Sequence, residues 1–170
     1  MMMRNDILIY FDLITSIKTT KEKDDLSSEI EDLLVSIFKA SGQSFDDILK
    51  TIRIDTAEKI NDAFRKSGLD SKNKEQIRNF LLTLIHLLTK FKIIRVTLAI
   101  EPTQQTIGNI HNWISANLGQ EYILDIETDP EVLGGAIIVF KGEYRDFTIK
   151  KNIETVFLAK KGQKFYALSN

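Results

Sequence analysis

The chain has 170 residues and a formal net charge of −1, with 43% hydrophobic and 28% charged residues. This composition is ordinary for a globular chain of one or two domains and excludes global disorder, while near-neutrality argues against a general nucleic-acid binder. The sequence contains no cysteine, which excludes disulfides, thiolate metal sites and a cysteine nucleophile.

The first part of the chain predicts helices. Apolar residues recur at spacings of three and four over residues 7–17. A polar stretch at residues 19–25 is expected to break this helix, and the same spacing begins again at Ile30. Gly42 is expected to end the second helix.

Shorter helices should follow. Two pairs of polar residues have the spacing of an N-cap and its partner: Ser44 with Asp47, and Asp55 with Glu58. They predict helices over residues 45–52 and 56–66, with Gly68 ending the second. Residues 1–91 therefore predict a bundle of about five helices.

The fifth helix of this bundle should be long and central. Asp70 or Ser71 is expected to cap it, and it should reach about Lys90. It is apolar over most of its circumference, which is typical of a helix surrounded by others.

Beyond residue 92 the periodicity changes to that of strands. The predicted order is strand 94–100, a helix ended by Gly119, strand 122–127, strand 136–140, a turn at 141–143, strand 144–148, and a last helix capped by Thr148. The stretch 136–140 is apolar on both faces, as in a central strand. The fold class is therefore α+β: a helical domain, residues 1–91, then a four-stranded domain with two helices, residues 92–170.

Residues that carry chemistry are sparse. The two histidines, His86 and His111, have no metal-ligand spacing, so we expect no metal site. Gly134-Gly135 precedes a strand instead of a helix, which favours a backbone role over phosphate binding. Neither apolar stretch, 7–17 or 80–88, is long enough to span a membrane, so we expect no direct membrane insertion.

Five lysines gather near the C-terminal end. They suit either a solvated helix face or a patch that contacts an acidic partner helix or lipid headgroups, and the first interpretation is favoured. They are Lys150, Lys151, Lys160, Lys161 and Lys164.

Residues 129–148 carry the most specific pattern. It comprises Asp129-Pro130, Leu133-Gly134-Gly135, an apolar strand, Gly142 in a turn, and Asp146 and Thr148 before a helix. This pattern resembles the delta subunit of F-type ATP synthase, the bacterial counterpart of the mitochondrial oligomycin-sensitivity-conferring subunit. The resemblance extends more weakly over nearly the whole chain, and it implies that these motif residues are structural.

The chain departs from that family in several places. Phe147-Thr148 stands where the family has Gly-Ser, although Thr148 keeps a capping hydroxyl, and Ala136 replaces a Phe. The family's sixth helix and the linker after it are expected to be absent, because Leu88 is followed almost directly by a strand.

The resemblance implies an adaptor, not an enzyme, with no cofactor. It implies a peripheral-stalk subunit on the cytoplasmic side of the cell membrane that binds N-terminal segments of alpha subunits and C-terminal helices of b subunits. Such a subunit holds the catalytic head still during proton-driven ATP synthesis. The alternative is a small α+β ligand-binding or regulatory domain with a helical dimerisation module.

By analogy with the family, the groove for the alpha segment lies between the first and fifth helices. Most of its candidate residues must also serve the core, which is the stronger interpretation for any one of them. They are Tyr10, Leu13, Ile14, Ile77, Leu81, Leu84 and Ile85.

Overall fold

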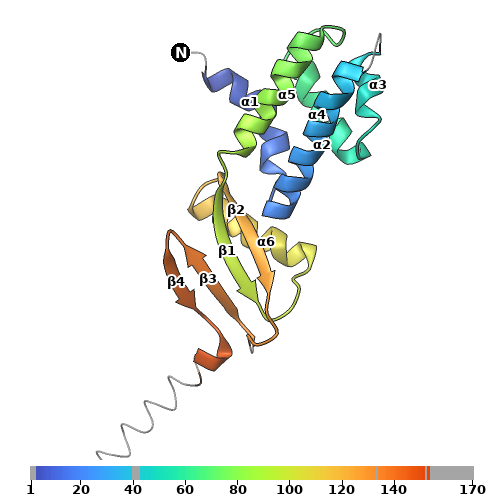
Figure 1. The fold of residues 1–170 in the computed structure, drawn as a ribbon. Helices are drawn as coiled ribbons and strands as arrows, with labels where there is room; N and C mark the ends of the chain where they lie inside the picture. Colours follow the sequence, from blue (N-terminus) through green and yellow to red (C-terminus); the bar gives the residue numbers. More distant parts are fainter. Residues whose placement is uncertain (1–2, 40–42, 133, 152, 154–170) are drawn as a thin grey trace, which may run out of the picture. The chain divides into compact units, whose positions relative to one another are not determined.

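The computed structural model describes residues 3–39, 43–132, 134–151 and 153. The chain divides into two compact units, Met1–Lys92 and Ile93–Asn170. The first is helical and the second contains a four-stranded sheet (Figure 1). The predicted fold class, α+β with helices before a small sheet domain, is confirmed.

The described part of the first unit contains helices α1 to α5. Their bounds are α1 Met3–Thr15, α2 Thr20–Lys39, α3 Phe45–Leu49, α4 Ile54–Lys66 and α5 Lys74–Leu88. Helix α1 packs mainly against α4, and α2 packs against α5. Aromatic rings join these pairs, since Phe80 of α5 lies 5.1 Å from Phe64 and 5.2 Å from Tyr10 between ring centroids.

Helix α2 begins earlier than the apolar spacing predicts. Thr19 Oγ1 accepts a hydrogen bond from the Glu22 amide at 3.2 Å, and the Glu22 carboxylate accepts one from the Thr19 amide at 3.1 Å. This reciprocal capping box starts the helix at Thr20, inside the stretch 19–25 that we expected to be a break. The break itself is shorter, because α1 ends at Thr15. Gly42 lies outside the described residues.

The start of α3 agrees with the sequence prediction, whereas the starts of α4 and α5 differ from it. Ser44 caps α3 as predicted. Helix α4 begins at Ile54 after Arg53, which makes no side-chain capping bond, so Asp55 lies in the first turn instead of at the cap. Gly68 follows α4 with a φ of +68°, as expected of a helix-ending glycine.

The cap of α5 is Asn73, neither of the residues that we expected. Asn73 Oδ1 accepts hydrogen bonds from the amides of Glu75 and Gln76 at 3.1 and 3.2 Å. Asp70 instead accepts from the Lys72 amide at 2.9 Å, which makes a turn before the helix. Helix α5 ends at Leu88 and strand β1 begins at Lys92, so no sixth helix stands between them.

The second unit is a sheet with the strand order β2-β1-β3-β4. Its elements are β1 Lys92–Leu98, α6 Gln104–Asn117, β2 Tyr122–Thr128, β3 Ala136–Phe140 and β4 Glu143–Asp146. Strand β3 runs antiparallel to both β1 and β4, while β1 and β2 point in the same direction (Figure 1). Lys141 and Gly142, with φ of +51° and +79°, form the tight turn between β3 and β4.

Helix α6 covers one face of this sheet. Ile107 and Ile114 of α6 join Ile94, Val96 and Leu124 in one buried cluster. After β4, residues 149–151 begin a helix as predicted. The rest of the expected last helix, with Lys160, Lys161 and Lys164, lies outside the described residues.

Candidate partner-binding surfaces

The seven groove candidates divide by burial. Tyr10, Leu13, Ile77, Leu81 and Leu84 are at most 7% exposed and belong to the core of the helical unit. Ile14 and Ile85 are half-buried. Of the seven, these two are therefore the residues that a partner could reach without opening the bundle.

The sides of α1 can be assigned from its neighbours. Asp12 pairs with Lys66 of α4 at 2.7 Å, so this side of α1 faces α4. Two residues further on, Ile14 lies about 160° round the helix from Asp12. Phe11, 39% exposed, lies on the same side of α1 as Ile14. These two side chains form an apolar rim on the side of α1 away from α4.

The sides of α5 follow in the same way. The ring of Phe80 marks the side that faces α1 and α4, because it lies against both Tyr10 and Phe64. Ile85 is about 140° round the helix from Phe80, whereas Leu87 is only about 20° from it. Leu87 is half-buried. The side of α5 along α1 therefore carries Leu87, which sequence reasoning counted only as part of a wide apolar surface.

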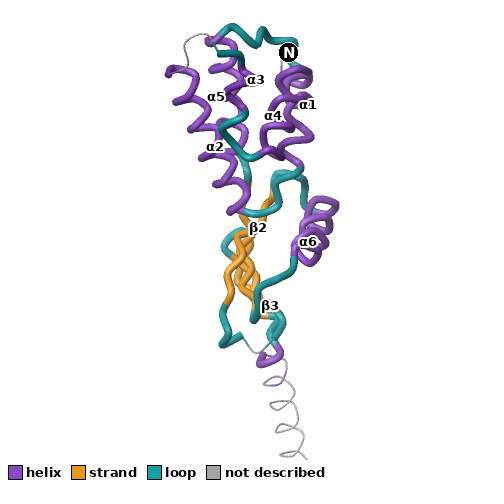
Figure 2. The backbone as a smooth tube through the Cα atoms, turned by 90° about the vertical axis from the view of Figure 1, so that its right-hand side faces the viewer, coloured by secondary structure: helices purple, strands orange, loops and turns teal. Residues whose placement is uncertain are grey.

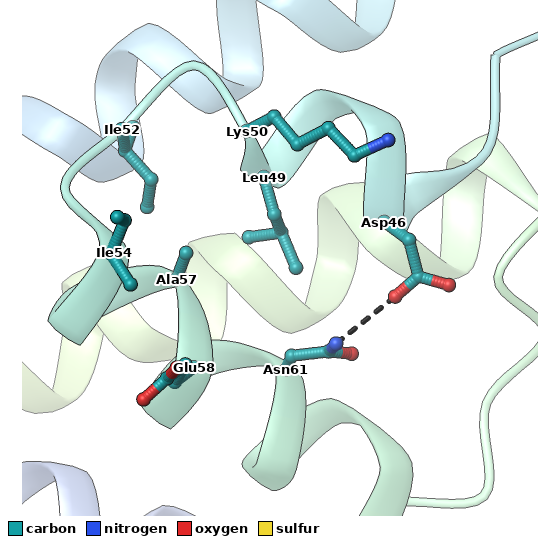
Figure 3. Close-up of a pocket in the computed structure, with 8 residues that line it drawn as sticks. All are labelled: Asp46, Leu49, Lys50, Ile52, Ile54, Ala57, Glu58 and Asn61. Atoms are coloured by element: carbon teal, nitrogen blue, oxygen red, sulfur yellow. Dashed lines mark hydrogen bonds between the residues drawn. The ribbon is translucent and has the colours of Figure 1, made fainter.

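A separate hollow of about 350 Å³ lies between α3 and α4 (Figure 3). Leu49, Ile52 and Ala57 give it apolar walls, and Ile54 is 74% exposed beside them. Asn61 donates a hydrogen bond to Asp46 at 3.0 Å across one end. Sequence reasoning missed this hollow. The available signal was Ile54, an apolar residue outside the buried stripe of α4.

An ion pair joins the chain segment just before α4, beside this hollow, to helix α2. Arg53, just before α4, contacts Glu29 through both its Nε and its Nη2. Burial raises the pKa of Glu29, but hydrogen bonds from Arg53 and Thr56 and the charge of Arg53 outweigh it, so the pKa of Glu29 is lowered from its ordinary value. Glu29 therefore stays ionised at neutral pH and holds the chain before α4 against α2.

The motif residues of the second unit shape the backbone. Asp129 donates its amide to the Leu98 carbonyl at 2.8 Å, and its carboxylate accepts from the Glu131 amide at 2.9 Å in the turn that contains Pro130. Gly134 and Gly135 have φ of +88° and +84°. A Cβ on Gly135 would collide with the Phe147 carbonyl oxygen and lie 2.9 Å from Thr148 Cα. Leu133 lies outside the described residues.

Asp146 and Thr148 end the last strand and start the helix after it. Asp146 Oδ1 accepts from the Thr148 amide at 2.9 Å, and Thr148 Oγ1 accepts from the Lys151 amide at 3.3 Å. A hydrogen bond from the Thr148 side chain, helped by its amide, lowers the pKa of Asp146. Thr148 is 5% exposed. The predicted capping hydroxyl is therefore in place.

The sheet face opposite α6 combines apolar and charged side chains. Arg95 Nε lies 3.2 Å from Asp125 Oδ2 and 3.7 Å from Glu127 Oε1. Ile137 and Val139 of β3 are half-buried beside them, and Tyr144 of β4 is 62% exposed.

Comparison with known proteins gives one family. No curated protein sequence matches the chain significantly. No helix in the described part of the chain has the length and apolar character to cross a membrane, and the described residues hold no metal-binding group of three or more His, Cys, Asp or Glu. Residues 88–157 match the model of the ATP synthase delta (OSCP) subunit family. The C-terminal part of the chain therefore carries the signature of the family that its motifs resemble, the delta (OSCP) subunit of ATP synthase.

Proposed function

We propose that the protein is a non-catalytic peripheral-stalk subunit of an F-type ATP synthase, on the cytoplasmic side of the membrane. The observation that carries the proposal is the family match over residues 88–157, which covers the whole sheet of the second unit. A helical unit precedes this sheet, in the order that the resemblance implies. The stalk role would link the catalytic head to the membrane-anchored b subunits and resist rotation.

The first proposed contact is between the helical unit and an N-terminal segment of the alpha subunit. The seam between α1 and α5 supports it, because Ile14 and Phe11 on α1 and Leu87 on α5 offer apolar surface along this seam. An amphipathic helix binds such a seam through apolar residues three and four apart. Leu87 takes the place of Ile85 in this proposal, because Ile85 lies on the other side of α5.

The second proposed contact is between the sheet unit and C-terminal helices of the b subunit. Its support is the family match, which falls on this unit. The two contacts lie on different units, so each can be tested separately on the full chain.

Isothermal titration of the full chain tests both contacts. One titrant is a synthetic peptide of the alpha N-terminal segment from the same organism, and the other is a b C-terminal segment. We expect each to bind at micromolar concentration or tighter. Binding by neither would overturn the stalk function.

Two neighbouring variants test the groove. Leu87→Asp should weaken alpha-segment binding at least tenfold, because it places a charge on the apolar rim. Ile85→Asp is the matched control, half-buried on the other side of the same helix, and should leave the affinity within about threefold. The reverse ranking would remove the groove assignment while leaving the stalk function intact.

A further inference from the structure

The sheet has one face covered by α6 and one that no described helix of this unit covers. Figure 2 views the strands nearly edge-on, with α6 on one side only. We call the uncovered side the open face. Its residues alternate with those of the α6 side along each strand: Ile93, Arg95 and Thr97 of β1, Ile123, Asp125 and Glu127 of β2, Ile137 and Val139 of β3, and Tyr144 and Asp146 of β4. Ile123 is fully buried, so the accessible part of this face excludes it.

The strand register sets these side chains in rows across the open face. Arg95 is opposite Val139, which is opposite Tyr144. The next row is Thr97, Ile137 and Asp146. Directly opposite side chains in such rows are about 5 Å apart, so Val139, Ile137 and the Tyr144 ring make one continuous apolar strip.

This strip is not what a water-facing side of a sheet carries. A strand with one face in water alternates apolar and polar residues, whereas β3 is Ala-Ile-Ile-Val-Phe and has no polar side chain on either face. Ala136, Ile138 and Phe140 account for the α6 side. Ile137 and Val139 therefore indicate that the open face is covered by another surface in the functional state.

The charges around the strip describe that surface. Asp125 and Glu127 are carboxylates on β2, and both contact the guanidinium of Arg95. Asp146 on β4 is a third carboxylate, but the charges of Lys150 and Lys151 act on it. The open face is thus acidic along its β2 edge, beside an apolar strip. A partner that covers it needs an apolar stripe with basic residues beside it, as an amphipathic helix provides.

We infer that the open face receives an amphipathic helix with basic flanks, laid across β1, β3 and β4. The inference rests on the proposed function, which supplies the occupant: a C-terminal helix of the b subunit. It adds which face of the sheet unit meets that helix and what chemistry selects it.

Two adjacent residues on β4 test the assignment, because successive side chains point to opposite faces. Tyr144 lies on the open face and is 62% exposed. Arg145 lies on the α6 face and is also exposed. In titrations of the full chain with the b C-terminal segment, Tyr144→Glu should raise Kd at least tenfold. Arg145→Glu should leave Kd within twofold. Equal weakening by both, or weakening by Arg145→Glu alone, would overturn the inference and leave the stalk function standing.

The charge part is tested by Glu127→Lys, which reverses an exposed carboxylate of the open face. It should weaken binding at least fivefold at low salt and less at high salt. A b segment with a basic flank residue changed to Glu should recover part of that loss. Unchanged affinity at low salt would refute the selection by charge.

A second measurement covers the case in which a substitution disturbs the fold. The chain contains no cysteine, so Tyr144→Cys and Arg145→Cys each create a single site for a maleimide. The b segment should slow labelling at residue 144 at least fivefold and leave residue 145 unchanged. If the wild type binds the b segment without protecting residue 144, the inference fails. If the wild type does not bind the b segment at all, the proposed contact with the b subunit fails.

Sedimentation of the same variants identifies a different occupant. A wild-type dimer that Tyr144→Glu dissociates, while b-segment affinity stays unchanged, would show that a second copy covers the open face. That result would overturn the inference.

Discussion

Two glycines with similar backbone conformation should respond very differently to a methyl group. Gly135 and Gly142 both have positive φ, but a Cβ at Gly135 meets backbone atoms of Phe147 and Thr148, while one at Gly142 meets nothing within 4 Å. Gly142→Ala should cost about 1 kcal/mol for the left-handed conformation alone. Gly135→Ala adds a collision that no side-chain movement relieves, for a total of about 3 kcal/mol.

Urea unfolding of the full chain measures this difference. The midpoint should fall about three times further for Gly135→Ala than for Gly142→Ala. Equal midpoints would mean that β4 can move away from Gly135, and that the close backbone approach is not what requires glycine there.

The role of Gly134-Gly135 could be predicted from sequence because an apolar strand follows it. A phosphate loop needs a helix N-terminus at that point, and none follows. The opposite holds for Ile85. Apolar spacing reports that a side chain faces other protein atoms, but it does not report which neighbour, and the Tyr10–Phe80 contact decides that. The sequence therefore predicted which residues near the candidate groove are buried, but it did not predict which of them line a surface that a partner can reach.

The Glu29–Arg53 pair predicts a pH dependence of the helical unit. The pKa of Glu29 is lowered in the folded protein, so its contribution to stability is present above the ordinary carboxyl range and is lost as pH falls through the folded value. Glu29→Gln should lower stability by about 1 kcal/mol at pH 7, a modest figure because Arg53 is exposed.

Thermal unfolding at pH 7 and at about pH 3 checks this, since one value lies above and the other below the ordinary carboxyl range. The difference between wild type and Glu29→Gln should shrink at the lower pH. Glu31→Gln, at an exposed carboxylate of the same helix, is the control. A difference that stays constant between the two pH values would contradict the role of the ionised pair.

At the scale of elements, helix α5 holds the first unit together. Leu81 is fully buried, and its neighbour Leu82 is 38% exposed. Leu81→Asp places an unpaired charge in the core and should cost about 4 kcal/mol or more, whereas Leu82→Asp should cost less than about 1 kcal/mol. Circular dichroism during heating should show loss of a cooperative helical transition for the first variant only. A cooperative Leu81→Asp variant would show that α5 is not central.

Element types were predictable along the described chain, and their starts were less so. Helix α2 illustrates the reason. The predicted apolar spacing begins at Ile30, but the capping box of Thr19 and Glu22 begins the helix ten residues earlier, at Thr20. Likewise three polar residues, Asp70, Ser71 and Asn73, compete for the cap of α5. The turn made by Asp70 with the Lys72 amide leaves that cap to Asn73.

At the scale of the whole molecule, two units in one chain should respond to substitution separately. The boundary between Lys92 and Ile93 falls at the start of β1, and each unit has its own buried cluster. If each unit folds around its own core, substitutions in different units should have additive effects on stability. Leu81→Asp should therefore remove the helical transition and leave the sheet unit folded, and Gly135→Ala should do the reverse.

The affinities of the full chain for the alpha segment and for the b segment test whether the two units respond independently. Leu81→Asp should abolish alpha-segment binding and keep b-segment affinity within about threefold, while Gly135→Ala should weaken only b-segment binding. The double variant should lose both. If either single variant lost both contacts, the two units would form one cooperative structure, and the rigidity of a stalk joint would reside in their mutual packing. If each variant lost only its own contact, the two units would fold and bind independently, and the rigidity of the joint would depend on both partners being bound at once.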